Sequence, residues 1–506
     1  MASPQGTSAG TVRTAPPPST RQGKRDHLVL WGLGIAVICS ILINVGSDLV
    51  DVLQDDYFYY HVIAENLWKG LGTSFLPGTL TNGYQPLWQF VVAAAVGLGH
   101  WLRVDPLHIS HLFASATGYA AILVLLRAPE QQRRLLPWLG IPLLAMIFYF
   151  ANMGMEAVAI TLAYAVYLRL ALSEQDRPLM MGVLLFICFM ARIDSVVYIV
   201  PLTLYLYRAP QRWRPLILSW ISFAVLAAGY AAINLHFYGV PVPVSGLAKN
   251  AVATTLHSAT FMTLLTSGSN LLTIALGLIG SLIAWRLAPG TRLLQLLSLV
   301  LVVGFYVLHS LRSDYGVWGW YLYPFALHLV TLIMLTQAPA TPVARTPVLT
   351  GLNALGLAGF VLMMAWHTVM NVPPHHKNPL HESAEFIAAT IAKERVQTVA
   401  MGDRAGVVAY LTPAALVQLE GLVMDKAYLD QLRQQQPLLN VLKHYGAQLY
   451  IATDPLPASK PGCFLVAEPS QPKDRRNEQE ICQPVIGKFT AKSGHTTVIF
   501  DVRAHE

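Results

Sequence analysis

The sequence predicts an α-helical polytopic membrane protein with about nine to eleven transmembrane helices and a small α/β domain at its C-terminal end. Of the 506 residues, 54% are hydrophobic and only 12% are charged, about half the charged share of an ordinary soluble domain. Apolar runs of about 15 to 22 residues recur from Leu28 to His367, too many and too long for the core of one soluble domain. These observations exclude a soluble single-core protein and predict that residues 27–372 lie in a lipid bilayer.

The N-terminal segment, residues 1–26, is rich in Ala, Pro, Ser and Thr and has no apolar periodicity, which predicts a disordered cytoplasmic tail. The run from Leu28 to Val45 is longer than a signal-peptide core and lacks a small-residue cleavage site, so we expect it to remain as a membrane anchor. A pair of short helices is expected at 179–192 and 195–207. Full crossings are expected near 28–48, 107–127, 135–151, 155–172, 215–236, 269–286, 293–311, 320–337 and 347–368.

Lys and Arg residues are concentrated on one side of the predicted spans. The tail and alternate loops hold fifteen of them, whereas the intervening loops hold four: Lys69, Arg103, Lys249 and Arg312. Basic residues are retained on the cytoplasmic side, so this bias, rather than a nucleic-acid-binding groove, accounts for the net charge of +7. The assignment requires residues 86–101 to form a re-entrant or interfacial helix, since a crossing there would invert every later loop. It predicts an extracytoplasmic C-terminal domain.

The C-terminal part, residues 373–506, alternates helical and strand-like patterns, which predicts a small α/β domain. We expect Cys463 and Cys482 to form a disulfide if this domain faces an oxidising compartment. The density of His375, His376 and His381 suggests a metal cluster, but the helical His-x-x-x-His spacing is missing, so we expect no metal there. Amphipathic helices are predicted at 381–394 and 424–445, and strands at 398–401, 407–411, 449–452, 464–467 and 496–500.

The first outward loop, residues 46–85, contains two adjacent acids, Asp55 and Asp56, at the start of an aromatic-rich helical stretch. One explanation is that Asp55 caps an interfacial helix whose aromatic residues form a membrane-interface belt. A cap requires neither the second acid nor the turn Asn82-Gly83-Tyr84 downstream. The combination therefore favours a functional site in this loop.

An acidic pair that opens a helix after the first span, followed by a Gly-rich turn and an Asn-Gly-Tyr-x-Pro-Leu-Trp stretch, resembles the GT-C membrane glycosyltransferases. The resemblance extends over most of the chain, although each motif is short. Further matching stretches are Asn152 to Glu156, Phe237 to Pro243, Gly402 to Gly406 and Leu419 to Val423.

The resemblance implies an enzyme that transfers a sugar from a polyprenyl-phosphate carrier on the extracytoplasmic side of the membrane. The acceptor would be an envelope glycan, a lipid or a protein, and the location would be the bacterial inner membrane. A divalent cation, Mg²⁺ or Mn²⁺, is an optional cofactor, because such a reaction needs cations or a metal to stabilise the charge on the departing phosphate.

Asp55 matches the first acid of the family motif and is the expected general base for the acceptor hydroxyl. Asp56 is the weaker choice, because adjacent residues on a helix point about 100° apart. Glu156 is expected to position a substrate or to join Asp55 around a metal. Its alternative role is that of a favourable acid at a helix N-terminus.

Lys249 and Arg312 are the outward cations expected to bind the donor phosphate, Arg through paired donors and Lys as a point charge. Each could instead be an ordinary snorkelling residue at the membrane surface. Four further side chains in or near these motifs are expected to contact substrate: Tyr60, Asn82, Tyr84 and Tyr321.

Two other functions are compatible with parts of the sequence. Arg192 and Asp194 interrupt the short helix pair at membrane depth, where they either form an ion pair or serve a pocket, and a transporter would also use such broken helices. No internal repeat is apparent, and transport does not explain the acidic, aromatic first loop. An oligosaccharyltransferase or ligase on the same fold is the second alternative.

Overall fold

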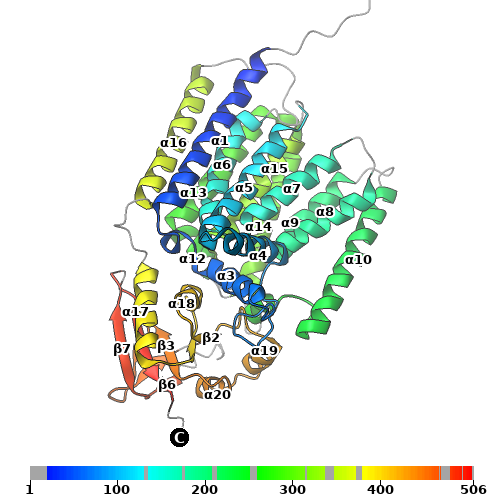
Figure 1. Cartoon of the computed structure of the whole chain (residues 1–506). Coiled ribbons are helices and arrows are strands. Elements are labelled where there is room, and N and C mark those ends of the chain that lie inside the picture. The colour runs from blue at the N-terminus through cyan, green and yellow to red at the C-terminus, as the bar shows by residue number, and fades with distance from the viewer. Residues whose placement is uncertain are drawn as a thin grey trace, which may run out of the picture.

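The computed structural model describes residues 20–129, 135–173, 177–207, 213–250, 259–313, 316–336, 347–371, 379–466, 468, 479–492 and 494–503. It consists of two parts, a bundle of long helices and, below it in Figure 1, a domain that contains the β-strands. The apolar and polar parts predicted from composition therefore fold as separate layers.

The bundle is built from apolar helices that run side by side along its long axis (Figure 1). Within the described residues, five helices are long and apolar enough to cross a bilayer, and shorter apolar helices accompany them. Every predicted span coincides with one of these helices. They are α1 (Thr20–Gly46), α5 (Pro106–Leu126), α6 (Leu136–Asn152), α7 (Ala157–Ala171), α8 (Pro178–Ala191), α9 (Val196–Leu206), α10 (Trp213–Tyr238), α13 (Gly268–Leu287), α14 (Arg292–Arg312), α15 (Tyr323–Leu335) and α16 (Pro347–Asn371).

The boundaries of α1 differ from the predicted tail, of which residues 1–19 lie outside the described part. The helix begins at Thr20 rather than after residue 26. Gln, Lys and Arg are good helix formers, so a helix fixed by its apolar part can extend into a polar segment. Deeper in the bundle, α6 and α15 are buried along almost their whole length and form its centre.

The two short helices α8 and α9 are separated by the 3-10 turn η1 (Ile193–Ser195). A break in a helix at membrane depth leaves backbone groups that need partners. Here the Ile193 amide donates to Gln85 Oε1 at 3.1 Å. A side chain from a distant segment of the chain thus satisfies one of the backbone groups that the break leaves without a helical partner.

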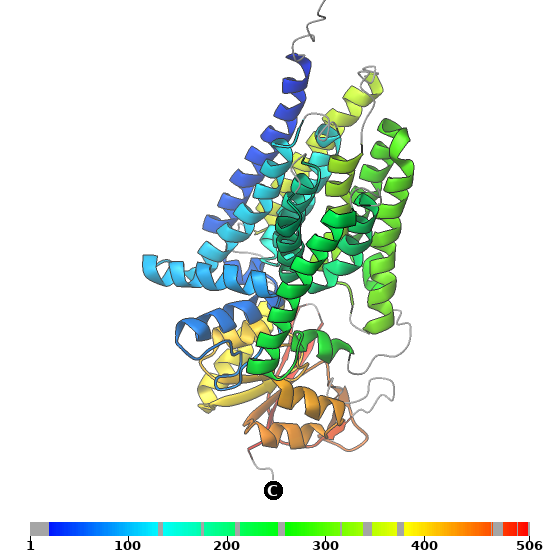
Figure 2. The same cartoon turned by 90° about the vertical axis from the view of Figure 1, so that its right-hand side faces the viewer.

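Residues 86–101 fall in α4 (Pro86–Leu102). In Figure 2 this light-blue helix lies across the lower end of the bundle, at a steep angle to the long helices. That orientation suits an interfacial helix rather than a crossing. Its exposed Phe90 and Trp101 are typical of a helix at the membrane surface.

Short helices connect the bundle to the lower domain. The helix α3 (Asp55–Trp68) lies between the two parts in Figure 1 and packs against α4 and α18. The other connecting elements are α2 (Leu49–Val52), α11 (Val244–Asn250), α12 (Ala259–Thr266) and η4 (Gly319–Leu322). At the opposite end of the bundle, η3 (Pro289–Thr291) joins α13 to α14.

The C-terminal domain has a five-stranded sheet in the order β2-β1-β3-β8-β7 and a three-stranded sheet in the order β4-β5-β6. β1 pairs in parallel with β2 and β3, whereas β8 is antiparallel to both of its neighbours. The strands are β1 (Thr398–Met401), β2 (Ala415–Gln418), β3 (Leu449–Thr453), β4 (Leu456–Pro457), β5 (Phe464–Val466), β6 (Gln479–Ile481), β7 (Val485–Thr490) and β8 (Thr496–Asp501). The helices are α17 (Pro379–Glu394), α18 (Ala405–Leu411), α19 (Lys426–Arg433) and α20 (Leu438–His444).

Several elements of this domain differ from the prediction. Strands β2, β4, β6 and β7 were not predicted. The strand predicted at 407–411 is wrong, because these residues form helix α18; a short apolar run does not distinguish the two structures by periodicity. The helix predicted at 424–445 is split into α19 and α20 by a turn that ends at Pro437, a residue that cannot continue a helix. The structure also joins Cys463 and Cys482 in a disulfide, with sulfur atoms 2.05 Å apart.

Candidate active site

A polar cavity lies where the first outward loop, the ends of later helices and the C-terminal domain meet. Its walls come from α3, from the loop before α4, from α11 and η4, and from the turn after β2. It brings together side chains separated by more than three hundred residues of sequence. The described lining residues are Asp56, Tyr59, Tyr60, Gly83, Tyr84, Gln85, Met155, Glu156, Ser245, Lys249, Trp320, Tyr321, Leu422 and Val423.

Asp56 is the carboxylate of the acidic pair that lines this cavity. Burial raises its pKa to about 7; the charge of Lys249 lowers the pKa, and the neighbouring acids Asp55 and Glu156 raise it again. Such a carboxyl group titrates near neutral pH, which is where a general base is most effective.

Lys249 comes from α11 and faces Asp56 across the same cavity. Its ammonium group donates to the Tyr321 hydroxyl at 2.8 Å and lies 5.3 Å from the centre of the Tyr321 ring. Burial lowers the pKa of Lys249, but Tyr321 and Asp56 outweigh this effect and raise it. The lysine therefore stays charged in the cavity.

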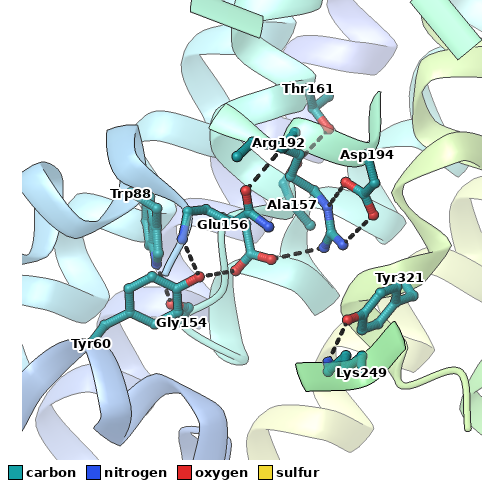
Figure 3. A network of polar contacts seen from close by, with 12 residues as sticks. Tyr60, Trp88, Gly154, Glu156, Ala157, Thr161, Arg192, Asp194, Lys249 and Tyr321 are labelled. Atoms are coloured by element: carbon teal, nitrogen blue, oxygen red, sulfur yellow. Dashed lines mark hydrogen bonds and ion pairs between the residues drawn. The ribbon is translucent and has the colours of Figure 1, made fainter. Parts of the chain in front are cut away.

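Glu156 belongs to a buried ionic network on the bundle side of the cavity (Figure 3). Arg192 donates to Glu156 Oε1 at 2.8 Å and forms a paired contact with Asp194, at 2.9 and 2.7 Å. The Tyr60 hydroxyl donates to Glu156 Oε2 at 3.3 Å. The Arg192 guanidinium also lies 4.6 Å from the centre of the Tyr321 ring.

This network accounts for the charged residues between α8 and α9. Arg192 is only 1% exposed and Glu156 only 2%, and a buried charge is costly unless it is paired. The ion pair expected between Arg192 and Asp194 is present, and Glu156 is a third member that the sequence did not link to them. The sequence does not indicate this cluster, because Glu156 and Arg192 are far apart along the chain and come into contact only in the folded protein.

A larger cavity of about 390 Å³ adjoins the first and shares Gln85, Ser245, Lys249 and Tyr321 with it. Its polar wall contains the cationic side chains of Arg192, Lys249 and Arg312, together with Asp194 and His309. The remaining wall is largely apolar. Its described apolar residues are Ile193, Val196, Val197, Val242, Pro243, Leu247, Phe305 and Leu308.

Asp55 is placed differently from its neighbour. Its Oδ1 accepts the Val407 amide at 2.8 Å and its Oδ2 accepts the Gly406 amide at 3.2 Å, both at the start of α18. Burial raises the pKa of Asp55 to about 6, although these hydrogen bonds lower it. Over the described part of the chain, the residues that line the two cavities include Asp56 but not Asp55.

The glycines of two sequence motifs lie at this same junction. A Cβ atom on Gly406 would come 2.3 Å from the Asp55 carbonyl oxygen, and one on Gly83 would come 1.9 Å from the Leu422 carbonyl oxygen. Both positions therefore require glycine for close backbone approach. The Asn-Gly-Tyr turn and the Gly402 to Gly406 stretch form opposite sides of one interface.

The other predicted substrate contacts divide into two groups. Tyr60, Tyr84 and Tyr321 line the polar cavity, and Arg312 lines the larger one. Asn82 is 2% exposed and holds the chain between α10 and α11: its amide donates to Val242 O at 3.2 Å and its Oδ1 accepts the Val244 amide at 3.0 Å. Asn82 is thus outside the described lining of both cavities.

The residues expected to share a metal do not fit that role. Both carboxylate oxygens of Asp55 accept backbone amides, and both of Glu156 contact side chains, Arg192 and Tyr60. Within the described residues, potential ligands converge elsewhere, at Asp48, Asp51 and His381, and at Cys463, Glu480 and Cys482, whose cysteines form the disulfide. His375 and His376 lie outside the described residues. Asp55 and Glu156 therefore do not form a shared metal site in this structure.

Several lining residues were missed by the sequence-based prediction. Leu422 and Val423 come from the C-terminal domain, and His309 comes from α14. Leu422 and Val423 belong to the Leu419 to Val423 stretch, which the family resemblance matches without assigning it a role, and His309 is one histidine within an apolar helix. No spacing pattern in the sequence indicates that these three residues line a cavity.

No protein-family model matches the chain, and no curated protein is detectably similar to it in sequence. In structure it is similar to ArnT from Cupriavidus metallidurans, solved with bound undecaprenyl phosphate, with a TM-score of 0.51 and 12% identity over 93% of this chain and 98% of that one. The arabinofuranosyltransferase AftD from mycobacteria matches with a TM-score of 0.46 and 14% identity, over 94% of this chain and 42% of that one. The likeness to ArnT confirms the predicted GT-C fold of an integral membrane protein.

Proposed function

We propose that this protein transfers a sugar from a polyprenyl-phosphate carrier to a glycan, lipid or protein acceptor of the cell envelope. The observation that carries the proposal is the pair of adjoining cavities that share Lys249 and Tyr321. One contains carboxylates, as acceptor activation requires. The other combines Lys249, Arg312 and the Arg192–Asp194 ion pair with apolar walls, as a phosphate on a long hydrocarbon chain requires.

In the proposed reaction, the Asp56 carboxylate accepts the proton of the acceptor hydroxyl. The acceptor oxygen forms a bond to the anomeric carbon, and the bond from that carbon to the phosphate oxygen breaks. The electron pair leaves with the polyprenyl phosphate. Lys249 and Arg312 stabilise the charge that develops on the departing phosphate. The base proposed from the sequence was Asp55; we propose Asp56 because its carboxylate lines the cavity.

Glu156 and Arg192 have a supporting role in this scheme. Their ion cluster fixes the Tyr60 hydroxyl on one side and the Tyr321 ring on the other. Rigid walls of this kind hold substrates close to the reacting geometry. Tyr60, Tyr84 and Tyr321 would contact the sugar or the acceptor.

The donor class and the side of the membrane are part of the proposal. ArnT was solved with undecaprenyl phosphate, which supports a polyprenyl-phosphate carrier for a chain of the same fold. The loop charge bias supports a site on the extracytoplasmic face of the bacterial inner membrane, with the C-terminal domain on that face.

The test compares Asp56→Asn with Glu65→Gln, a matched acid-to-amide change on the same helix. Glu65 contacts His100 at 2.8 Å, away from the cavities. Turnover is measured with a polyprenyl-phosphate sugar, and binding is measured separately with undecaprenyl phosphate. Asp56→Asn should lower turnover about a hundredfold or more and leave lipid binding intact. Lys249→Met should weaken binding as well as turnover.

Full activity of Asp56→Asn together with loss of activity in Asp55→Asn would return the role of base to Asp55. If wild-type protein neither bound undecaprenyl phosphate nor transferred sugar from such donors, the proposed function itself would fail. Glu65→Gln should behave as wild type in both assays.

A further inference from the structure

The short helix α11 carries Lys249 and is held from several sides. At its start, the Val244 amide donates to Asn82 Oδ1 at 3.0 Å. The helix has seven residues, too few to be stable alone in water. Its position must therefore come from the surfaces against which it packs.

One of those surfaces belongs to the C-terminal domain. Val244 and Ala248, one turn apart on α11, form a buried cluster with Leu429 and Leu432 of α19. The exposed fractions are 2% for Leu432 and 1% for Leu429. This cluster is separate from the main core of the C-terminal domain, so its main role is to join α19 to α11.

A second close contact also joins the C-terminal domain to α11. The Cβ position of Gly421, in the turn after β2, lies 3.6 Å from the Ala248 Cβ atom. The next residue along α11 is Lys249, which points about 100° away from Ala248. Its ammonium group reaches Tyr321 and lines both cavities. The helix thus has the C-terminal domain on one face and the cavities on the other.

We propose that Leu432 is a positioning residue for recognition of the lipid phosphate, acting through α11 on Lys249. The C-terminal domain then does more than cap the site, because α19 sets where the charge of Lys249 lies. Replacement of Leu432 by a smaller residue leaves a cavity where its side chain packed against α11. The helix α11 can then shift into that cavity, and Lys249 shifts with it. A displacement of about 1 Å is enough to weaken a site built around fixed charges. This inference rests on the proposed function.

The test measures binding of undecaprenyl phosphate to the purified full-length protein in detergent, as wild type, Leu432→Ala, Lys249→Met and the double variant. We expect Leu432→Ala to weaken binding about tenfold, which lies within the range of coupling between residues linked through a backbone shift. In the Lys249→Met background the same truncation should have little further effect, because the charge it positions is gone. Leu432→Met should restore most of the affinity.

Leu442→Ala is the control for a merely structural effect. Leu442 lies on α20, is fully buried in the main core of the same domain, and is not part of the cluster that contacts α11. It should lower the melting temperature at least as much as Leu432→Ala but leave the affinity within about twofold. If Leu432→Ala were also within twofold of wild type, the inference would be refuted while the proposed function stood. Equal weakening by Leu432→Ala with and without Lys249 would likewise refute it.

Discussion

Replacement of Asp55 by alanine should loosen the contact between the first outward loop and helix α18. The side chain accepts two backbone amides, from Val407 at 2.8 Å and Gly406 at 3.2 Å. Each hydrogen bond to a charged group contributes about 1.5–3 kcal/mol, but the cost of burying the carboxylate offsets part of this. We expect a net loss of about 1–3 kcal/mol in the local stability of the start of α18.

Hydrogen exchange followed by mass spectrometry measures this loss directly. A local opening equilibrium shifted by about 1–3 kcal/mol corresponds to exchange about 5 to 150 times faster for the amides at the start of α18. Asp105→Ala is a matched control, because Asp105 caps α5 by accepting the Leu107 amide at 2.9 Å. That variant should change exchange at the start of α5 only.

Unchanged exchange of α18 in Asp55→Ala would refute the reasoning that Asp55 anchors the C-terminal domain. Equal acceleration of α18 in Asp105→Ala would also refute it, because the effect would then be a general loosening. Exchange in β3, at the centre of the domain's sheet, should stay slow in both variants.

Three further predictions follow from the site and the topology. Because burial raises the pKa of Asp56 to about 7 and a base must be ionised, turnover should rise about tenfold per pH unit below 7 and level off above about 8; a flat rate profile across that range would contradict the role of Asp56. Arg192→Met leaves Glu156 and Asp194 without their shared partner, at a cost of about 3–5 kcal/mol, so its melting temperature in detergent should fall well below those of wild type and Arg192→Lys, whereas equal values would contradict the buried network. In intact cells a cysteine at Ser459 should react with a membrane-impermeant thiol reagent and one at Ser173 should not; labelling at Ser173 would overturn the orientation.

The sequence by itself determined the membrane-spanning elements. An apolar run long enough to cross a bilayer must satisfy its backbone hydrogen bonds within the helix, so composition and length are sufficient to locate it. This is why α5, α10, α13 and α14 were predicted close to their observed bounds, and why the apolar part of α1 was located although the start of that helix was not. The prediction that residues 86–101 form a re-entrant or interfacial helix came from charge balance, which is also a property of the chain alone, and the steep angle of α4 to the bundle is compatible with it.

The sequence was less informative where an apolar run was short. Residues 407–411 were predicted as a strand, but they belong to helix α18. The helix starts there because the preceding turn and the Asp55 carboxylate satisfy its first backbone amides. Strand β2 was missed for the same reason: four residues give no usable periodicity. Such segments take their structure from their neighbours.

Only the tertiary structure decides which role each motif residue has. Adjacent residues of one helix point in different directions, so only the packing of α3 decides that Asp56 lines the cavity while Asp55 binds α18. Similarly, Glu156 meets Arg192 only because α7 and the break after α8 are neighbours in the bundle. Sequence can supply residues of the right chemistry, but charge pairing and cavity walls depend on distances between segments that are remote along the chain.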